Sequence, residues 1–493
     1  KYADASIPLF HTTAGEETIT GLKAATYNLE NGKIVETRMA KDAVFTEKFN
    51  RYFNLKKFSL PNVKEGSVIE YSYTVRSDYI INFPNWEFQS TIPTRISEYW
   101  AMIPEFFIME RYMQGYVTAT EYKEDTRPRN DYIEKTFHWV IRDVPAFKEE
   151  PYMTSKTDYI SRINFALSQI IMPGRPIVNV VGTWQKLAKD LLESESFGKI
   201  VYGSSYTKKV TEELVGSETD PQKKIEMIFA FVQKQIEWDK TNDFLARSPK
   251  EVFDERKGSS GDINLILASM LEKAGFEVDL VVLSTRDHGF VRQQYPMARQ
   301  FDYVICRLAH GGKYFLIDAT EKHLPFGIIP ERCLNGEGLI VSPKNTGWVE
   351  LTSRTKARSV ISADMKLVPD GELTGTLAYT RDGYDALKIR NQFNRLQEEA
   401  YQKQLQSERP TWNISNVRFE HLGILDKPVK TTLELGVEEN VDDQGQTIYI
   451  NPFIEGRLTS NPFVSESRLY PVDFARPEER IYMCKLTIPD GYT

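Results

Sequence analysis

The sequence has few cysteines, and their spacing gives them no shared role. Three of the 493 residues are cysteine, and Cys306, Cys333 and Cys484 form no CxxC pair. Such a set encodes neither a structural zinc site nor a disulfide framework, and at most one bridge could form. Scarce cysteine is compatible with reducing and oxidising compartments alike, so it does not identify the compartment.

Long apolar runs, basic tracts and phosphate-binding glycine loops are also missing. The longest nearly uncharged apolar stretch, Tyr99 to Met109, is interrupted by Pro104 and Glu105 and is shorter than the roughly 18 residues of a spanning helix. Lys and Arg number 62 against 69 Asp and Glu, a net charge of −7, which argues against nucleic acid as the main partner. We therefore expect no membrane span, no nucleotide site and no cofactor.

Metal sites are similarly unsupported. The acidic pair Asp442-Asp443 precedes Gln444-Gly445, a composition typical of a turn. A calcium role is the weaker alternative, because the loop lacks spaced oxygen ligands and a closing Glu. We predict no metal site.

What is present is the composition of a soluble globular protein. Hydrophobic residues make up 41% of the chain, aromatic residues 12% and charged residues 27%. At roughly 100–200 residues per domain, the length favours three domains. We place them at residues 1–170, 171–350 and 351–493. The chain begins with Lys1 and has no apolar leader, which is compatible with an export signal that has been removed.

The first region has the pattern of short strands. From about residue 17 to 170, alternating segments such as Val68 to Val75 are separated by proline and glycine. This predicts an all-β, sandwich-like domain. Its many aromatic side chains could form a carbohydrate platform, but we favour core positions between sheets for Trp86, Tyr99, Trp100, Phe106, Phe107 and Trp139.

The middle region changes to helices followed by strands. Apolar residues recur at helical spacing over 184–192, over 225–236 after Asp220-Pro221, and over 260–274 before Gly275. Strands are predicted at 278–283, 301–308 and 313–318. This pattern indicates an α+β domain.

The last region returns to strands, for example 372–379 and 431–437, around one long polar helix. We expect that helix at about 386–405, largely solvated, docking only through Leu387, Phe393, Leu396 and Tyr401. The region as a whole is predicted to be a mainly β, sandwich-like domain.

A turn of small residues leads directly into the third helix of the middle region. In Lys257-Gly258-Ser259-Ser260-Gly261-Asp262, the residue at the helix start lies beside unpaired N–H groups and the positive end of the helix dipole. A thiol there would be acidified. The simplest interpretation is that Ser259 or Ser260 is the N-cap.

Downstream, Ala309-His310-Gly311-Gly312 joins two predicted strands into a hairpin. If residues 308 and 313 pair, Tyr303 lies opposite Asp318 on one face of the sheet. Cys306 then points to the other face.

With these segments in hand, residues 180–345 resemble the transglutaminase-like core of the papain-like cysteine enzymes. That family has a Gly-x-Cys turn starting a helix, then a His and an Asp on successive strands. The resemblance implies that Ser260 stands at the Cys position, Tyr303 at the His position and Asp318 at the Asp position. The flanking regions are similar to β-rich domains of bacterial envelope proteins, most clearly at 63–71.

Two of the three chemical roles are therefore replaced. A serine hydroxyl needs a base during attack, and a phenol titrating near about 10 is a poor proton acceptor at neutral pH. We predict a catalytically degenerate core that serves as a binding or scaffolding module, with an extended peptide or glycan in its cleft. The Tyr303 hydroxyl would bond to Asp318, and Ser260 would cap the helix.

Two alternatives remain open. One is a Ser260-dependent amide hydrolase or acyltransferase with His288, in the loop 285–290, as its base; His310 and His323 are placed less favourably. The other is a purely structural protein whose cleft is sealed by neighbouring domains. The resemblance implies an exported protein of the bacterial periplasm or cell surface.

Overall fold

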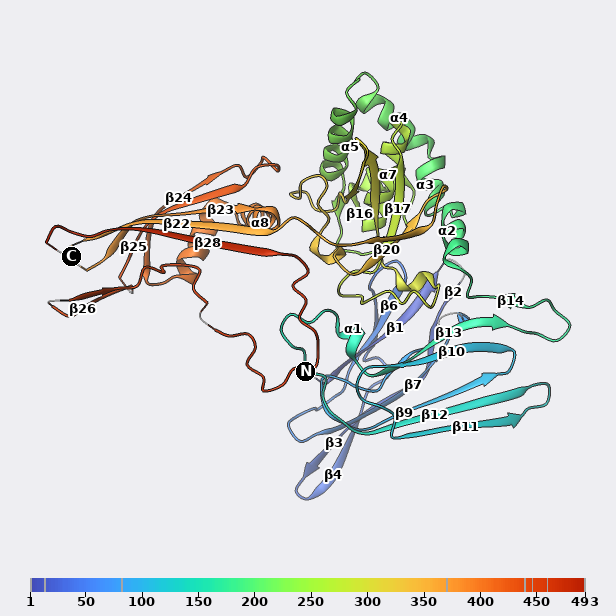
Figure 1. The fold of residues 1–493 in the computed structure, drawn as a ribbon. Helices are drawn as coiled ribbons and strands as arrows, with labels where there is room; N and C mark the ends of the chain where they lie inside the picture. Colours follow the sequence, from blue (N-terminus) through green and yellow to red (C-terminus); the bar gives the residue numbers. More distant parts are fainter. Residues whose placement is uncertain are drawn as a thin grey trace.

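The computed structural model describes residues 2–12, 15–80, 83–368, 371–438, 440–445, 447–458 and 460–491. Figure 1 shows a β-rich region in blue to cyan, a core of helices and a sheet in green to yellow, and a long sheet in orange to red. The protein is thus a mixed α+β, multidomain structure with β-rich regions. Within the described ranges, no helix is long and apolar enough to cross a bilayer.

The first half of the β-rich region forms two sheets, with strand orders β2-β1-β6-β5 and β4-β3-β7. Alternate apolar side chains of β1 are buried with Phe58 of β6 in a small cluster that includes Ile7 and Leu9, whereas β4 and β7 are largely exposed. The strands are β1 (Asp4–Thr12), β2 (Gly15–Glu16), β3 (Thr18–Glu30), β4 (Lys33–Arg38), β5 (Val44–Lys48), β6 (Phe53–Ser59) and β7 (Val68–Arg76).

The second half forms two more sheets around a separate aromatic cluster. Their orders are β10-β13-β14, with β8 also pairing with β13, and β11-β12-β9. The elements are β8 (Trp86–Glu87), β9 (Thr94–Pro104), β10 (Phe107–Gln114), β11 (Glu121–Pro128), β12 (Ile133–Val144), α1 (Lys156–Tyr159), β13 (Arg162–Ile170) and β14 (Val178–Asn179).

The aromatic side chains of this half divide between the core and the surface. Trp139 is buried in the aromatic cluster, as the sequence pattern predicts. Trp86 and Trp100 are instead exposed, and Trp100 stacks on the ring of His138 at 3.6 Å. The core prediction is wrong for these two residues: Trp100 faces away from the cluster on β9, and Trp86 lies on the two-residue strand β8, where it stacks on Tyr99 but is only partly covered.

Helices α2 to α7 and one sheet form the middle region. The elements are α2 (Trp184–Glu193), α3 (Gly198–Gly203), α4 (Ser205–Val215), α5 (Pro221–Gln235), β15 (Glu237–Trp238), α6 (Pro249–Glu255), β16 (Lys257–Gly258), α7 (Ser260–Lys273), β17 (Val278–Leu283), β18 (Tyr303–His310), β19 (Lys313–Ile317), β20 (Glu337–Val341) and β21 (Gly347–Glu350). The antiparallel sheet has the order β19-β18-β17-β20-β21.

Helix α7 is the central element of this region. It packs on β17 and β18 and is surrounded by α3, α4 and α5, so its residues from Ser260 to Leu271 are all buried. Ser259 is the N-cap, and a capping box links it to Asp262 in both directions. The helix begins and ends where the sequence predicts, with Gly275 at a positive φ just beyond it.

The hairpin register differs from the predicted one by two residues. Strand β18 continues to His310, which pairs with Lys313, and leaves only Gly311-Gly312 as the loop. Both glycines have positive φ, which suits a two-residue primed turn. Continuing this register places Tyr303 opposite residue 320 and not opposite Asp318. The shift is even, so the predicted faces of Tyr303 and Cys306 are correct.

The C-terminal region is one five-stranded sheet, β24-β25-β23-β22-β28, with β28 parallel to β22. Helix α8 and a hairpin pack on it, so it is not the two-sheet sandwich expected from the sequence. Ile389 and Tyr401 on α8 supply apolar cover. The elements are β22 (Ala357–Leu367), β23 (Leu373–Asp382), α8 (Gly383–Glu408), β24 (Trp412–Glu420), β25 (Val429–Val437), β26 (Val441–Asp443), β27 (Ile448–Ile450) and β28 (Glu478–Thr487).

A long connection between β27 and β28 returns to the other two parts of the protein, as Figure 1 shows near α1. The Tyr470 ring packs against Phe147 and Tyr159 of the β-rich region. The Asp473 carboxylate forms an ion pair with the guanidinium of Arg286 in the core, at 3.2 Å. This connection therefore ties the C-terminal sheet to both preceding parts of the chain.

Candidate functional site

Ser260, at the first position of α7, has both hydrogen-bonding roles of its hydroxyl occupied. Its Oγ donates to the carbonyl of Asp243 at 2.8 Å and accepts from the N–H of the same residue at 2.8 Å. The side chain is completely buried. Ser260 is therefore not the helix cap, and its hydroxyl contacts the preceding loop instead of a cleft.

The loop that covers Ser260 also closes the start of α7. The carbonyl of Thr241 accepts the Ser260 N–H at 3.1 Å. Gly261 has no room for a side chain, because an added Cβ would lie 2.3 Å from the Leu245 carbonyl oxygen. This loop therefore encloses the start of α7.

A residue from the β-rich region fixes the loop. Arg51 lies between β5 and β6, and its guanidinium pairs with the Asp243 carboxylate and donates to the Leu245 carbonyl at 2.9 Å. Burial raises the pKa of Asp243, and the charge of Arg51 opposes that effect. The same burial raises the pKa of the neighbouring Tyr52 to about 12, with the charge of Asp243 adding to it. The loop is therefore held from outside the core.

Tyr303 lies on the face of the sheet that does not contact α7. It packs with Val281 and Leu283 and with Ala357 and Tyr384 of the C-terminal region. Leu280, Val282, Val304 and Cys306 form the opposite face, against α7. Burial, followed by the charge of Asp318, raises the pKa of Tyr303 well above its ordinary value. A phenol in this environment is a poor proton acceptor.

Asp318 follows β19 and is completely buried. Its carboxylate accepts from the side-chain N–H of Asn264 at 2.8 Å, from the backbone N–H of Thr320 at 2.8 Å and from the Thr320 hydroxyl. Asn264 also donates to the Val304 carbonyl and accepts the Ala319 N–H, so it joins α7 to two strands. Asp318 is thus a structural acceptor.

Thr320 separates Tyr303 from Asp318. Because the single Thr320 hydroxyl proton goes to Asp318, the Tyr303 hydroxyl donates to Thr320, at 2.9 Å. Arg332 donates to both hydroxyls and pairs with Glu321 at 2.6 Å. The predicted direct bond between Tyr303 and Asp318 is therefore wrong, because the two-residue turn moves Thr320 into the opposing position.

His288 is occupied at a different interface. Its Nδ1 bonds to the Ser284 hydroxyl at 2.8 Å, and its carbonyl accepts from Thr157 of the β-rich region at 2.8 Å. Ser260 has no hydrogen bond to His288, His310 or His323 in the part of the chain that the structure describes. The structure thus does not bring Ser260 and a histidine base together by a hydrogen bond.

The thiols offer no substitute nucleophile. Burial raises the pKa of Cys306 and of Cys333 well above the ordinary value, and both side chains are enclosed. Cys484 is half-buried in the C-terminal sheet. No group of three or more His, Cys, Asp or Glu side chains that could hold a metal ion occurs among the described residues.

The comparisons with known proteins match this core and, for one solved structure, most of the chain. Residues 208–318, from α4 to Asp318, match the family model for the transglutaminase-like superfamily. The chain contains a transglutaminase-like core in this segment. No curated protein matches the chain.

One of the matching solved structures is similar in fold over most of the chain. A putative protease from Parabacteroides distasonis ATCC 8503 superposes with a TM-score of 0.52 at 12% identity, covering 89% of this chain and 86% of that chain. A putative cysteine protease from Cytophaga hutchinsonii gives 0.19 at 11% identity, covering 48% and 74%. The periplasmic domain of TgpA from Pseudomonas aeruginosa gives 0.20 at 11% identity, covering 61% and 87%.

The sequence analysis did not identify three residues that organise this site. Asn264 interrupts the apolar stretch of α7, and a buried amide needs partners, so this residue carried a usable signal. No sequence signal marks Arg51 or Arg332, because nothing in their neighbouring residues distinguishes them from solvated arginines.

Proposed function

We propose that the transglutaminase-like core is a non-catalytic scaffold that holds the β-rich region and the C-terminal sheet together. The observation that carries this proposal is the Ser260 hydroxyl, which is completely buried and bonded twice to Asp243. A nucleophile must reach its substrate, and a serine must pass its proton to a base. The Ser260 hydroxyl is enclosed, which argues against access to a substrate, and both of its hydrogen bonds go to the backbone of Asp243, which argues against a base.

Electrostatics supports the same proposal. The positive end of a helix dipole and a nearby imidazolium can convert a thiol to a thiolate, but an alcohol is far less acidic. At the position of the expected base, Tyr303 faces away from α7 and bonds to Thr320. The remaining carboxylate, Asp318, already accepts three hydrogen bonds from Asn264 and Thr320.

The contacts between regions describe what the core does instead. Arg51 connects the β-rich region to the loop over Ser260. On the other face, Tyr384 of α8 packs beside Tyr303 and donates to the Ile329 carbonyl at 2.9 Å. Two of the three positions of the catalytic pattern, Ser260 and Tyr303, therefore lie next to a contact between two parts of the chain.

Ligand and location follow as further parts of the proposal. An extended peptide or glycan would bind to a surface other than Ser260, Tyr303 and Asp318, because these three are enclosed.

Export to the bacterial periplasm or cell surface rests on the sequence resemblance of the flanking regions. Fractionation of a cell that expresses the full gene would test it, and a purely cytoplasmic protein would refute it.

The experiment for catalysis compares the wild-type protein with Ser260→Ala and Ser259→Ala. Peptide amide hydrolysis and amine incorporation into a glutamine peptide are measured. We expect neither reaction above the buffer blank in any of the three. Ser259→Ala is the matched control, since it removes the helix cap without touching the Ser260 position. Activity that is present in wild type and Ser259→Ala but absent in folded Ser260→Ala would refute the proposal.

A further inference from the structure

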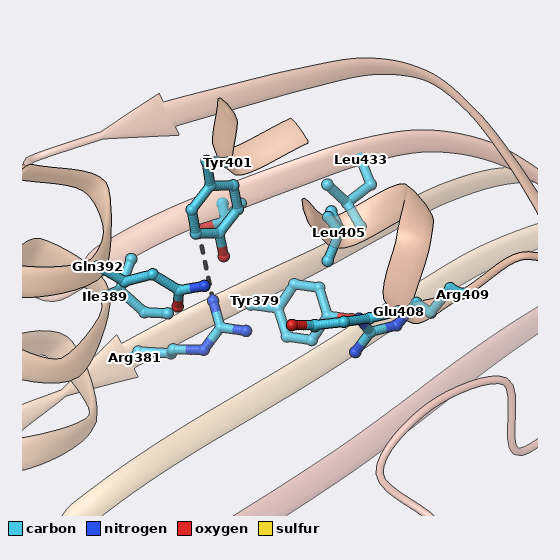
Figure 2. Close-up of a pocket in the computed structure, with 10 residues that line it drawn as sticks. Tyr379, Arg381, Ile389, Gln392, Tyr401, Leu405, Glu408, Arg409 and Leu433 are labelled. Carbon is cyan, nitrogen blue, oxygen red and sulfur yellow. Dashed lines mark hydrogen bonds and ion pairs between the residues drawn. The ribbon is translucent and has the colours of Figure 1, made fainter. Parts of the chain in front are cut away.

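The C-terminal region contains a cavity that the scaffold does not use. It has a volume of about 150 Å³ and lies between α8 and the sheet. Figure 2 shows Arg381, Gln392 and Tyr401 directed toward one space, with Tyr379 at its floor. A cavity of about this volume can hold a ligand as large as benzene.

Arg381 is a cation without a carboxylate partner. The guanidinium lies over the Tyr379 ring at 4.1 Å, and its one hydrogen bond to a described residue is a long contact of 3.4 Å to the Thr431 hydroxyl. No described acidic side chain forms an ion pair with it. Since a guanidinium has five N–H donors, most of them have no acceptor among the residues that the structure describes.

The nearby carboxylate is already occupied. Glu455 accepts two bonds from Arg409, at 2.8 and 2.6 Å, and a third from the Tyr379 hydroxyl at 3.1 Å. Arg409 is therefore neutralised, whereas Arg381 forms no ion pair with a described residue, although the charges of Asp385 and Glu455 act on it. Burial lowers the pKa of Arg381, as expected for a cation held away from water without a partner.

Two further polar groups adjoin this charge. Tyr401 is buried with its ring against Phe419, and its hydroxyl forms no hydrogen bond to a described residue. The amide of Gln392 lies beside the guanidinium in Figure 2. The site thus offers a planar cation, a hydroxyl and an amide around one small space.

We infer that this cavity binds a carboxylate group, with Arg381 as its main anchor and Tyr401 as a second donor. A planar guanidinium matches the geometry of a carboxylate with two parallel hydrogen bonds. One unpaired positive charge suits a monoanion, whereas the phosphate dianion would meet repulsion from Glu455 and Glu408 at the edge. The carboxylate can come from a peptide C-terminus or from an acidic side chain.

The first experiment titrates the full chain with sodium acetate, N-acetylglycine, N-acetylglycinamide and inorganic phosphate by calorimetry. We expect acetate and N-acetylglycine to bind with a Kd on the order of 1 mM, and the uncharged amide not to bind. Succinic acid monoamide, a mimic of the acidic side chain, separates the two sources by its affinity relative to N-acetylglycine. Tighter binding of phosphate than of acetate would overturn the assignment to a carboxylate.

The second experiment uses variants. Arg381→Gln should weaken acetate binding by about tenfold or more, and Tyr401→Phe by a few-fold, because each removes a donor to a charged acceptor. Arg418→Gln is the matched control: this arginine lies on β24 of the same sheet, is exposed and already pairs with Glu434. Acetate affinity that is unchanged in both Arg381→Gln and Tyr401→Phe would overturn the inference. If Arg381→Gln does not fold, unchanged affinity in Tyr401→Phe is the overturning result.

Discussion

The start of α7 and the cavity under α8 both hold polar side chains inside the fold, but the two places differ in how those side chains are hydrogen-bonded. At α7, the Ser260 hydroxyl has both roles filled and is closed off by Arg51 and the loop around Asp243. Under α8, Arg381 faces an open space with most of its donors unused.

This difference is the basis for proposing a structural role for the first place and a binding role for the second. Buried polar groups are normally satisfied, so a complete set of internal partners indicates a structural role. A half-buried charge without an ion-pair partner among the described residues, such as Arg381, is the kind of group that a missing ligand would satisfy. The start of α7, which resembles an enzyme site, is thus enclosed with its hydroxyl fully bonded. The cavity under α8, which has no recognisable sequence motif, is the place with unused hydrogen-bond donors. Four stability predictions test this contrast.

The largest effect is expected at Tyr303. Tyr303→Ala removes a completely buried ring from the cluster shared with Tyr384 and should lower the free energy of unfolding by about 3–5 kcal/mol. Tyr303→Phe keeps the ring and should cost about 1–3 kcal/mol, because Thr320 loses one of its two donors and Arg332 loses an acceptor. Urea unfolding measures both. A loss below about 1 kcal/mol for Tyr303→Ala would mean that the ring is not part of a packed core.

A smaller loss is expected at Arg332. Its guanidinium pairs with Glu321 and stacks on Trp238 at 3.9 Å. Arg332→Met leaves a mostly buried Glu321 without a partner, at a cost of about 2–4 kcal/mol. The double variant with Glu321→Gln should recover part of that loss in the same urea assay. Equal losses in the single and double variants would show that the pair does not matter.

Arg51 gives a pH-dependent test. Burial raises the pKa of Asp243 above its ordinary 3.8, so the folded state holds that proton more tightly and loses stability as pH rises through the folded value. Arg51→Ala removes the opposing charge and raises the pKa further. We expect a loss of about 1–3 kcal/mol at neutral pH that shrinks as pH falls toward 3.8.

The control for this effect is Arg51→Ala combined with Asp243→Asn, which has no carboxylate to titrate. Thermal unfolding across the pH range should show the pH-dependent penalty in the single variant and not in the double variant. The same pH dependence in both would assign it to another group.

The smallest effect is expected at Arg381. Arg381→Met removes a cation that has no carboxylate partner and keeps an apolar stem, so the free energy of unfolding should change by less than about 1 kcal/mol in either direction. The free energies of unfolding of Arg381→Met and Arg332→Met are compared in the same urea assay. The comparison distinguishes an arginine that stabilises the fold from one that we propose binds a ligand. A loss as large as that of Arg332→Met would remove the contrast.

The sequence predicted the elements of the core well and their side-chain network poorly. Apolar periodicity and a strong capping signal locate α7 and β17, because both signals are local. The hairpin register failed because Gly311-Gly312 alone forms the turn, and His310 gave no sign of belonging to the strand.

The candidate site was recognised from its linear pattern, but its chemistry depends on residues far away in the chain. Arg51 approaches Asp243 from a different region, and Tyr384 reaches the Tyr303 cluster from α8. The Arg381 cavity had no sequence signal, because an arginine in an alternating strand looks solvated until α8 is placed over it.

The most direct test of the scaffold is the reactivity of a thiol placed at the Ser260 position. The Ser260→Cys variant is treated with iodoacetamide under native conditions. Mass spectrometry follows alkylation of the introduced thiol and, as internal references, of Cys306 and Cys484. The enclosed position should react as slowly as the buried Cys306 and much more slowly than the half-buried Cys484. Rapid alkylation of the introduced thiol, at a rate equal to or above that of Cys484, would contradict a sealed structural role.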